Sequence, residues 1–268
     1  YYLIKNNIQI HLLYFTGNHF SFPLLNFLGI HALRSRIIGG VSANIQEFPY
    51  IVSFRNIEDN IHFCAGSIIS HWNVLSAAHC FIEFENEFDD VRMYSGTSSS
   101  FDVSGPTFTI QHIVFHIDYQ RPERLDFINL HDIAIIKTNE HIEFNQFQNK
   151  INLPTRDLFQ GNIGRVAGWG VTSYPHNRLS LFLRQAALDI IDHEHCMPIV
   201  PIILDETQFC GIHTVAITTC VGDSGGPLVS NDELFGIISF SFQCADGVPD
   251  VHTKVYSYLD FIRGHLLD

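Results

Sequence analysis

The chain of 268 residues is 46% hydrophobic and 13% aromatic, so it can bury a substantial core and is not expected to be disordered. Its formal net charge of −13 gives nucleic-acid binding no electrostatic support, because phosphate recognition needs clustered Lys and Arg. No apolar run reaches the ~20 residues that a membrane-spanning helix requires. We therefore expect neither nucleic acid nor membrane as a partner.

Residues 1–36 differ in composition from the rest of the chain. They contain no Asp or Glu, and their only Lys or Arg residues are Lys5, Arg34 and Arg36. Within them, residues 20–32 (FSFPLLNFLGIHA) have the apolar character and small final residue of a signal-peptide core. We predict that residues 1–36 form a signal and a short pro-segment that are removed, which makes the protein secreted and extracellular.

Short apolar or alternating segments recur from residue 48 onward, separated by Gly, Pro, Asn and Ser. Many short strands with such turn signals are typical of an all-β sandwich or barrel. The segments predicted as strands are 50–54, 67–69, 74–78, 108–115, 133–137, 164–167, 186–191, 227–229 and 234–240.

A midpoint near residues 149–154 (NKINLP) divides these segments into two strand-rich halves, 37–149 and 150–268. Helical periodicity appears mainly at the end of the chain, at Val255, Tyr258, Leu259, Ile262 and Leu266. We predict one C-terminal amphipathic helix that packs on the last β unit.

The chain has six cysteines, an even number that favours disulfides in an oxidising compartment. Spacing alone does not choose among the 15 pairings that six cysteines allow. No Cys-x-x-Cys occurs, so a metal site is the weaker interpretation. His193 and His195 flank Glu194, but we predict a polar surface loop there, because their i, i+2 spacing is not typical of a metal site.

Three local contexts suggest nucleophilic chemistry. His79 lies in the segment LSAAHC, Asp132 in HDIAII, and Ser224 in GDSGGP. A serine hydroxyl is a poor nucleophile unless a neighbouring base takes its proton, and a buried carboxylate can hold that base in the right tautomer. Glycines around the serine let backbone N–H groups point at a developing oxyanion.

Taken singly, each context is more often structural: a histidine beside a cysteine, a strand-end aspartate or a glycine-rich turn. Together, in this order and with these flanks, they resemble the trypsin/chymotrypsin family of serine endopeptidases, in particular its invertebrate secreted or digestive members. The resemblance covers residues 37–267 and includes the segments INLP at 151–154, AGWG at 167–170 and VHTKV at 251–255. It implies two six-stranded antiparallel Greek-key barrels, with the active site between them and a C-terminal helix.

The resemblance also implies a role for each residue of the site. His79 is the general base and later the acid, Asp132 orients it, and Ser224 attacks the carbonyl carbon of the substrate. The backbone N–H groups of Gly222 and Ser224 form the oxyanion hole, and Ser239 donates a hydrogen bond to Asp132. The implied disulfides are Cys64–Cys80, Cys196–Cys210 and Cys220–Cys244.

An activation site is implied as well. Cleavage after Arg36 by a trypsin-like protease frees an ammonium group on Ile37, which then pairs with Asp223. Partners of such an enzyme are protein or peptide substrates, the activating protease and protein protease inhibitors, and the enzyme itself is a monomer.

The specificity pocket departs from the family pattern. Its base is Thr218 instead of the aspartate of trypsins, and Asp250 stands where relatives commonly carry glycine. Asp250 either supplies a carboxylate for Lys or Arg side chains, or bonds to Thr218 or Thr219 and reshapes a pocket for aromatic or leucine side chains. We favour the second, a chymotrypsin-like or mixed preference. The residues predicted to form the pocket are Thr218, Thr219, Ser239, Phe240, Ser241 and Asp250.

No metal or other cofactor is expected. The loop at 95–108 corresponds to a calcium site in some relatives, but its only acid is Asp102, and hard cations need several oxygen ligands. The alternative function is that of a non-catalytic homologue acting as a binding or regulatory protein. Such homologues usually lose a residue of the triad, and all three residues are present here.

Overall fold

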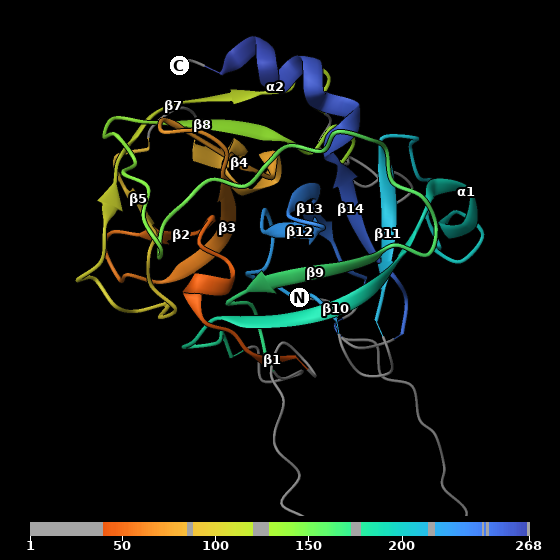
Figure 1. Cartoon of the computed structure of the whole chain (residues 1–268), viewed down its shortest axis with the longest axis horizontal. Coiled ribbons are helices and arrows are strands. Elements are labelled where there is room, and N and C mark those ends of the chain that lie inside the picture. The colour runs from red at the N-terminus through yellow and green to blue at the C-terminus, as the bar shows by residue number, and fades with distance from the viewer. Residues whose placement is uncertain are drawn as a thin grey trace, which may run out of the picture. The chain divides into compact units, whose positions relative to one another are not determined.

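The computed structural model of the chain describes residues 40–84, 88–119, 129–172, 178–213, 218–242, 244 and 247–266. The predicted signal and pro-segment, with Arg36 and Ile37 at its cleavage site, lies outside these ranges. Within them most regular structure is β-strand, and the strands form two barrel-like sheets, so the predicted fold class is confirmed (Figure 1). Each sheet has seven strands instead of the predicted six, because each includes a strand of only two residues, β6 at Thr107–Phe108 or β1 at Val41–Ser42.

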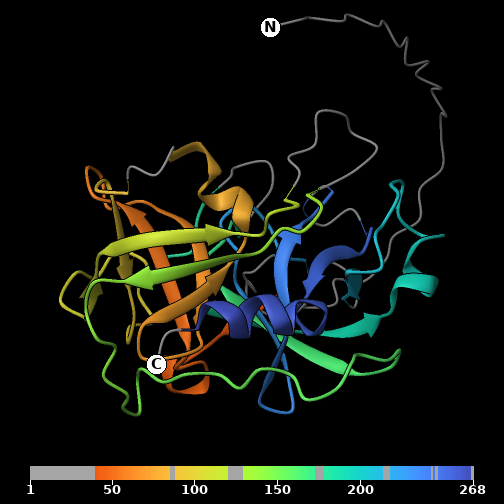
Figure 2. The same cartoon turned by 90° about the horizontal axis from the view of Figure 1, so that it is seen from above.

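The first sheet has seven antiparallel strands in the order β6-β5-β2-β3-β4-β8-β7. After three consecutive strands, β2, β3 and β4, the chain returns so that β5 lies beside β2, which is the Greek-key arrangement. Figure 2 shows β7 and β8 side by side in opposite directions. The bounds are β2 Ile51–Asn56, β3 His62–Ile68, β4 Asn73–Ser76, β5 Val91–Tyr94, β6 Thr107–Phe108, β7 Ile110–Phe115 and β8 Ala134–Thr138.

The second sheet also has seven antiparallel strands, in the order β1-β10-β11-β14-β13-β12-β9, and β9 also pairs with β10, which closes the barrel. The two-residue strand β1 pairs with β10, so the start of the predicted first half belongs to the second sheet. The bounds are β1 Val41–Ser42, β9 Ile163–Gly168, β10 Arg184–Ile191, β11 Gln208–Ile212, β12 Pro227–Ser230, β13 Glu233–Phe240 and β14 Asp250–Lys254.

Alternation of side chains explains why these segments are strands. In β10, Ala186, Leu188 and Ile190 are buried, whereas Ala187 and Asp189 are exposed, because successive side chains point to opposite faces of a sheet. The buried residues of β10 join those of β9, β12 and β13 in one apolar cluster inside the second barrel. In the first barrel the strands bury almost every residue of β2, since both faces of that strand are covered.

Short helices occupy the connections and the end of the chain. They are η1 Ile45–Glu47, η2 Ala78–Cys80, η3 Ile82–Phe84, α1 His193–Cys196, η4 Val255–Tyr258 and α2 Leu259–His265. The expected polar loop at His193 and His195 is instead the helix α1, because Asp192 caps it by accepting from the backbone N–H of His195. No helix in the described part of the chain is long and apolar enough to cross a membrane.

The C-terminal helix packs more widely than the sequence predicts. Besides contacting the second half, it reaches residues of the first half: the Tyr258 hydroxyl lies 3.0 Å from His131 Nδ1, and the Phe261 ring packs edge-on against His116. Val255, Tyr258 and Ile262 share one apolar cluster with residues of both barrels. The helix therefore ties the end of the chain to both halves.

Three disulfides join Cys64 to Cys80, Cys196 to Cys210 and Cys220 to Cys244. Each closes a loop of 14 to 24 residues, so each limits the freedom of the unfolded chain over a short segment.

Truncation of Ile262, the buried residue of α2, tests how the C-terminal helix packs. Ile262 is fully buried, so Ile262→Ala is expected to lower the free energy of unfolding by about 2–5 kcal/mol, through lost apolar contacts and the cavity left behind. Its exposed neighbour gives the control, since Arg263→Ala is expected to change stability by less than about 0.5 kcal/mol. Urea unfolding of the two variants measures both values, and equal losses would contradict the assigned packing.

Candidate active site

The buried carboxylate of Asp132 bonds to His79 of the first half and to Ser239 of the second half. β4 pairs with β8 in a register that sets Ser76 opposite Ala134, and this brings the segments after β4 and before β8 to one edge. His79 Nδ1 lies 2.7 Å from Asp132 Oδ2, and the backbone N–H of His79 donates to Oδ1 at 2.9 Å. Ser239 Oγ, from the second half, donates to the same carboxylate at 2.5 Å.

This environment sets the protonation of His79. Burial by itself would lower the pKa of His79, but the charge of Asp132 and the hydrogen bond to it outweigh burial, so the pKa is raised above its ordinary value. Because Asp132 accepts the Nδ1 proton, the neutral ring carries its lone pair on Nε2. The His79 side chain keeps 26% of its surface exposed, so Nε2 can act as a base.

A turn of unusual backbone conformation carries Ser224. Gly222 and Gly225 have φ values of +95° and +77°, which residues with a Cβ atom rarely adopt. At Gly225 a Cβ atom would also overlap Ser76 Oγ and the carbonyl oxygen of Ala65. The Ser224 carbonyl accepts a hydrogen bond from the backbone N–H of Ala65 at 2.8 Å, so the turn is attached directly to β3 of the first sheet.

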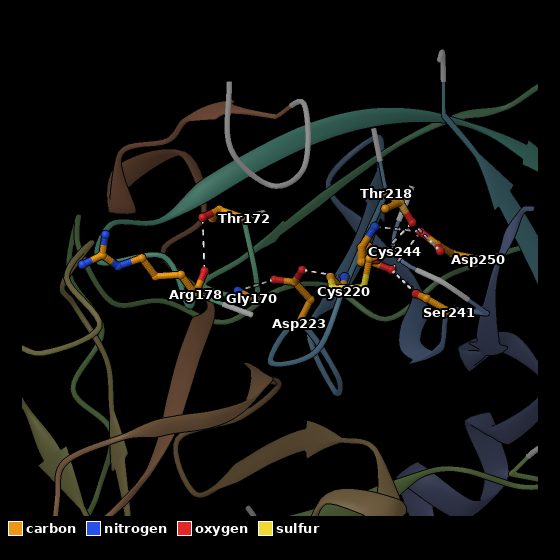
Figure 3. Close-up of a disulfide and its surroundings, with 10 residues drawn as sticks. Gly170, Thr172, Arg178, Thr218, Cys220, Asp223, Ser241, Cys244 and Asp250 are labelled. Carbon is orange, nitrogen blue, oxygen red and sulfur yellow. Dashed lines mark hydrogen bonds between the residues drawn. A yellow bond between two sulfur atoms is a disulfide. The ribbon is translucent and has the colours of Figure 1, made fainter. Parts of the chain in front are cut away.

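Residues from both halves line one cavity of about 450 Å³. His79 comes from the first half, and Ser224 and Ser239 come from the second. The remaining lining is largely apolar and includes the disulfide drawn in Figure 3: Asn129, Cys220, Val221, Ile238, Phe240, Ser241, Phe242 and Cys244.

The carboxylate of Asp223, next to Ser224, is also buried. It accepts from the backbone N–H groups of Gly170 at 2.8 Å and Cys220 at 3.0 Å (Figure 3). A Cβ atom at Gly170 would overlap this carboxylate, so glycine is required there. Burial raises the pKa of Asp223 to about 7 despite these two donors. No ion pair to Asp223 is found within the described ranges.

Asp250 is held by its own set of donors, one of which contacts Ser241 of the cavity wall. Its Oδ1 accepts from Thr218 Oγ1 at 2.9 Å, and its Oδ2 accepts from the backbone N–H and the hydroxyl of Thr219, both at 2.8 Å (Figure 3). Thr219 Oγ1 also lies 2.9 Å from Ser241 Oγ, and His213 Nε2 lies 3.4 Å from Oδ2. Asp250 is thus bonded to both threonines of the predicted pocket.

Burial alone would raise the pKa of Asp250. The hydrogen bond from His213, the nearby His252 and the N–H of Thr219 outweigh that effect and hold the pKa below its ordinary value. His252 lies two residues further along β14 and is itself fully buried, and burial lowers its pKa to about 4.

Residues 37–262 match the protein family described as Trypsin. The chain is 32% identical to Chymotrypsin-2 of Vespa crabro over 232 residues, and this matched stretch covers 86% of this chain and 100% of that protein. It is 30% identical over 254 residues to Trypsin I-P1 of Gallus gallus, covering 94% and 96% of the two chains. Trypsin I-P38 of Gallus gallus is also 30% identical, over 85% of this chain and 88% of its own length.

The chain belongs to the trypsin family. The resemblance inferred from the sequence is therefore confirmed, and the protein is a serine endopeptidase whose substrates are proteins or peptides.

In this trypsin-family chain the predicted site residues form two groups. His79, Ser224 and Ser239 line the cavity together with Phe240 and Ser241, and Asp132 is bonded to both His79 and Ser239. Thr218, Thr219 and Asp250 lie in a separate buried group that touches the cavity through Ser241 and is not part of its described lining.

Several residues around the site are not predicted from the sequence. Val221 and Phe242 directly adjoin predicted residues, so a wider window around each motif includes them. His252 is two residues from Asp250, and the two-residue period of a strand places both on one face. Asn129 and His213 carry no local signal, because only the folding of distant segments brings them to this region.

Within the described residues, three side chains of types that can bind a metal ion lie close together, namely Cys64, His79 and Cys80. The two cysteines are bonded to each other, so neither offers the thiolate that binds a metal ion. His79 is already held by Asp132.

The buried carboxylate of Asp223 predicts a pH-dependent stability in the chain not cleaved at Arg36. Because its pKa rises from 3.8 to about 7, the folded state keeps a proton that the unfolded state releases between these values. The free energy of unfolding should then fall as the pH rises from about 4 to 7, with a slope of about 1.4 kcal/mol per unit from this group.

Asp223→Asn is expected to remove that slope, as measured by urea unfolding at several pH values. The exposed Asp189→Asn serves as control and should keep the wild-type profile. A variant at Asp223 with an unchanged pH profile would contradict the assignment.

Proposed function

We propose that this trypsin-family enzyme is a secreted endopeptidase that cleaves peptide bonds through Ser224, His79 and Asp132. The observation that supports it most is that His79, bonded to Asp132 at 2.7 Å, lines the same cavity as Ser224. The three disulfides support an oxidising, extracellular location.

In the proposed reaction, Ser224 Oγ attacks the carbonyl carbon while His79 Nε2 takes the hydroxyl proton. Asp132 stabilises the imidazolium that forms. The N–H groups of Gly222 and Ser224 stabilise the oxyanion of the tetrahedral intermediate. His79 then gives its proton to the leaving amine, which breaks the peptide bond and leaves an acyl-enzyme on Ser224. Water, deprotonated by His79, attacks this ester, and the peptide acid leaves as Ser224 regains its proton.

The proposed enzyme is made as a zymogen and activated by a trypsin-like protease that cleaves after Arg36. The new ammonium group of Ile37 then pairs with Asp223. A buried carboxylate with a pKa near 7 and no cation in contact within the described ranges supports this proposal, because a buried charge is costly until it is paired. Pairing would fix the turn that precedes Ser224.

The cavity supports a chymotrypsin-like preference for the residue before the cleaved bond. Its wall presents Val221, Ile238, Phe240 and Phe242 to a side chain entering it. The carboxylate of Asp250, in contrast, has donors on both oxygens and would have to release them to bind a cation. An arginine or lysine side chain would therefore lose hydration without gaining a free counter-charge.

Turnover of peptide substrates after processing at Arg36 tests the proposed triad. We expect the processed enzyme to hydrolyse them and to be labelled by a serine-directed phosphonate. Ser224→Ala should lose nearly all activity, because nucleophile and base act as a unit. Arg36→Gln should stay uncleaved and inactive while keeping the same fold. A processed wild-type protein with neither turnover nor labelling would support the non-catalytic homologue instead.

A pair of substrates that differ only in the residue before the cleaved bond tests the preference. We expect kcat/KM for phenylalanine to exceed that for arginine by at least about tenfold, since burying an apolar ring is worth about 1.5–3 kcal/mol. Asp250→Asn should leave the phenylalanine preference in place. If Asp250 instead binds cationic side chains, arginine will be the better substrate, and Asp250→Asn will selectively abolish its cleavage.

A further inference from the structure

Arg55 is a buried charge with an unusual set of partners. It lies in β2 with no exposed surface, and its guanidinium stacks on the Tyr94 ring, 4.1 Å from the ring centroid. Nη2 donates to the carbonyl of Ser99 at 2.8 Å, and Nη1 donates to the carbonyl of Asp102 at 2.9 Å. No ion pair to Arg55 is found among the described residues, so its bonds go to neutral oxygens.

The Nε donor of this guanidinium begins a chain of hydrogen bonds that ends at the turn carrying Ser224. Arg55 Nε donates to Ser53 Oγ at 3.0 Å, and Ser53 Oγ lies 2.8 Å from His62 Nδ1. His62 Nε2 in turn lies 2.7 Å from the carbonyl oxygen of Gly222. All three side chains are buried, with exposures of 0%, 0% and 2% for Arg55, Ser53 and His62.

The direction of each bond in this chain follows from its two ends. A guanidinium has only donors, so Ser53 must accept from Arg55, and the Gly222 carbonyl can only accept, which favours a proton on His62 Nε2. The bond between them then runs from the Ser53 hydroxyl to His62 Nδ1. Burial and the charge of Arg55 keep the pKa of His62 down at about 4, so the ring is neutral near pH 7. With Nδ1 accepting, the ring proton sits on Nε2 and is donated to Gly222.

We propose that Arg55 is a positioning residue for the oxyanion hole, because it selects the His62 tautomer that holds the Gly222 carbonyl in place. The inference rests on the proposed function of the Gly222 and Ser224 N–H groups. The Gly222 carbonyl belongs to the same peptide as the Asp223 N–H, which donates to the Cys220 carbonyl at 2.9 Å. Rotation of that peptide would break both bonds and would move the N–H groups on either side of it.

The other tautomer of His62 would have the opposite effect. Its Nε2 would present a lone pair to the lone pairs of the Gly222 carbonyl, and this repulsion favours rotation of the peptide. Without a cation beside Ser53, the hydroxyl can accept from Nδ1 as readily as it donates to it. Loss of Arg55 therefore leaves the Gly222 carbonyl as the one end of the chain that still favours this tautomer, although His62 and Ser53 remain.

Arg55→Met tests this relay, the chain of hydrogen bonds from Arg55 through Ser53 and His62 to Gly222. The variant keeps the length and apolar stem of the side chain and removes every donor. We expect kcat per active site, counted by phosphonate titration, to fall about tenfold while KM changes less than about twofold. Nuclear magnetic resonance of the labelled His62 ring should change from the Nε2–H form to a mixture. Arg55→Lys, which keeps a donor and the charge, should restore part of kcat.

Ser53→Ala also interrupts the chain of hydrogen bonds between Arg55 and His62, and it leaves the bonds from Arg55 to Ser99 and Asp102 intact. We expect a similar loss of kcat from Ser53→Ala and no further loss in the double variant with Arg55→Met. Asp102→Asn retains the carbonyl that Arg55 binds and should keep wild-type kcat.

Wild-type kcat in Arg55→Met, an unchanged His62 tautomer or additive losses in the double variant would each overturn the proposal. If the wild-type enzyme has no turnover, the proposed function fails, whereas the His62 measurement still decides on the relay. If Arg55→Met does not fold, Ser53→Ala and the His62 measurement give the answer.

Discussion

The buried carboxylate of Asp132 is the contact on which the arrangement of the site depends. It holds the backbone and ring of His79 from the first barrel and accepts from Ser239 of the second. The backbone carbonyl of Asp132 also accepts from Thr253 Oγ1 of the second barrel at 2.9 Å. A carboxylate taken out of water is tolerated only when its lone pairs are met by donors. The barrels must therefore keep a fixed relation at this point, since separating them would leave the charge without part of its donors.

The site contains further buried charges, and most are matched by neutral donors or acceptors instead of opposite charges. Asp223 accepts from two backbone N–H groups, Asp250 accepts mainly from two threonines, and Arg55 donates to two carbonyls and a hydroxyl. Such networks contribute little net stability, because desolvation offsets much of what they gain. They do restrict geometry, because each bond holds its donor and its acceptor at a fixed distance and direction. In this chain they hold the segments around Ser224 that have no regular secondary structure.

The parts of this protein that depend on local pattern can be predicted from its sequence. The contexts of His79, Asp132 and Ser224 and most strands of both barrels follow from short segments. Strands β1, β5, β11 and β14 are not predicted, because these segments of two to five residues become strands only by pairing with strands far along the chain. The supporting residues are also non-local. Arg55 reaches acceptors 44 and 47 residues away, and His62 reaches a carbonyl 160 residues away, separations that no local pattern reveals.

The departures from the family pattern become intelligible once these networks are considered together. An aspartate in place of a glycine at position 250 would be expected to place an uncompensated charge beneath the cavity. Thr218 and Thr219 supply two hydroxyls and a backbone N–H to that charge, and Ser241 extends the group to the cavity wall. The side chains that are unusual for the family are therefore partners of one another. Under the proposed specificity, a carboxylate so enclosed would act on substrate choice through the shape of the wall it supports, because its charge is already matched before any substrate enters.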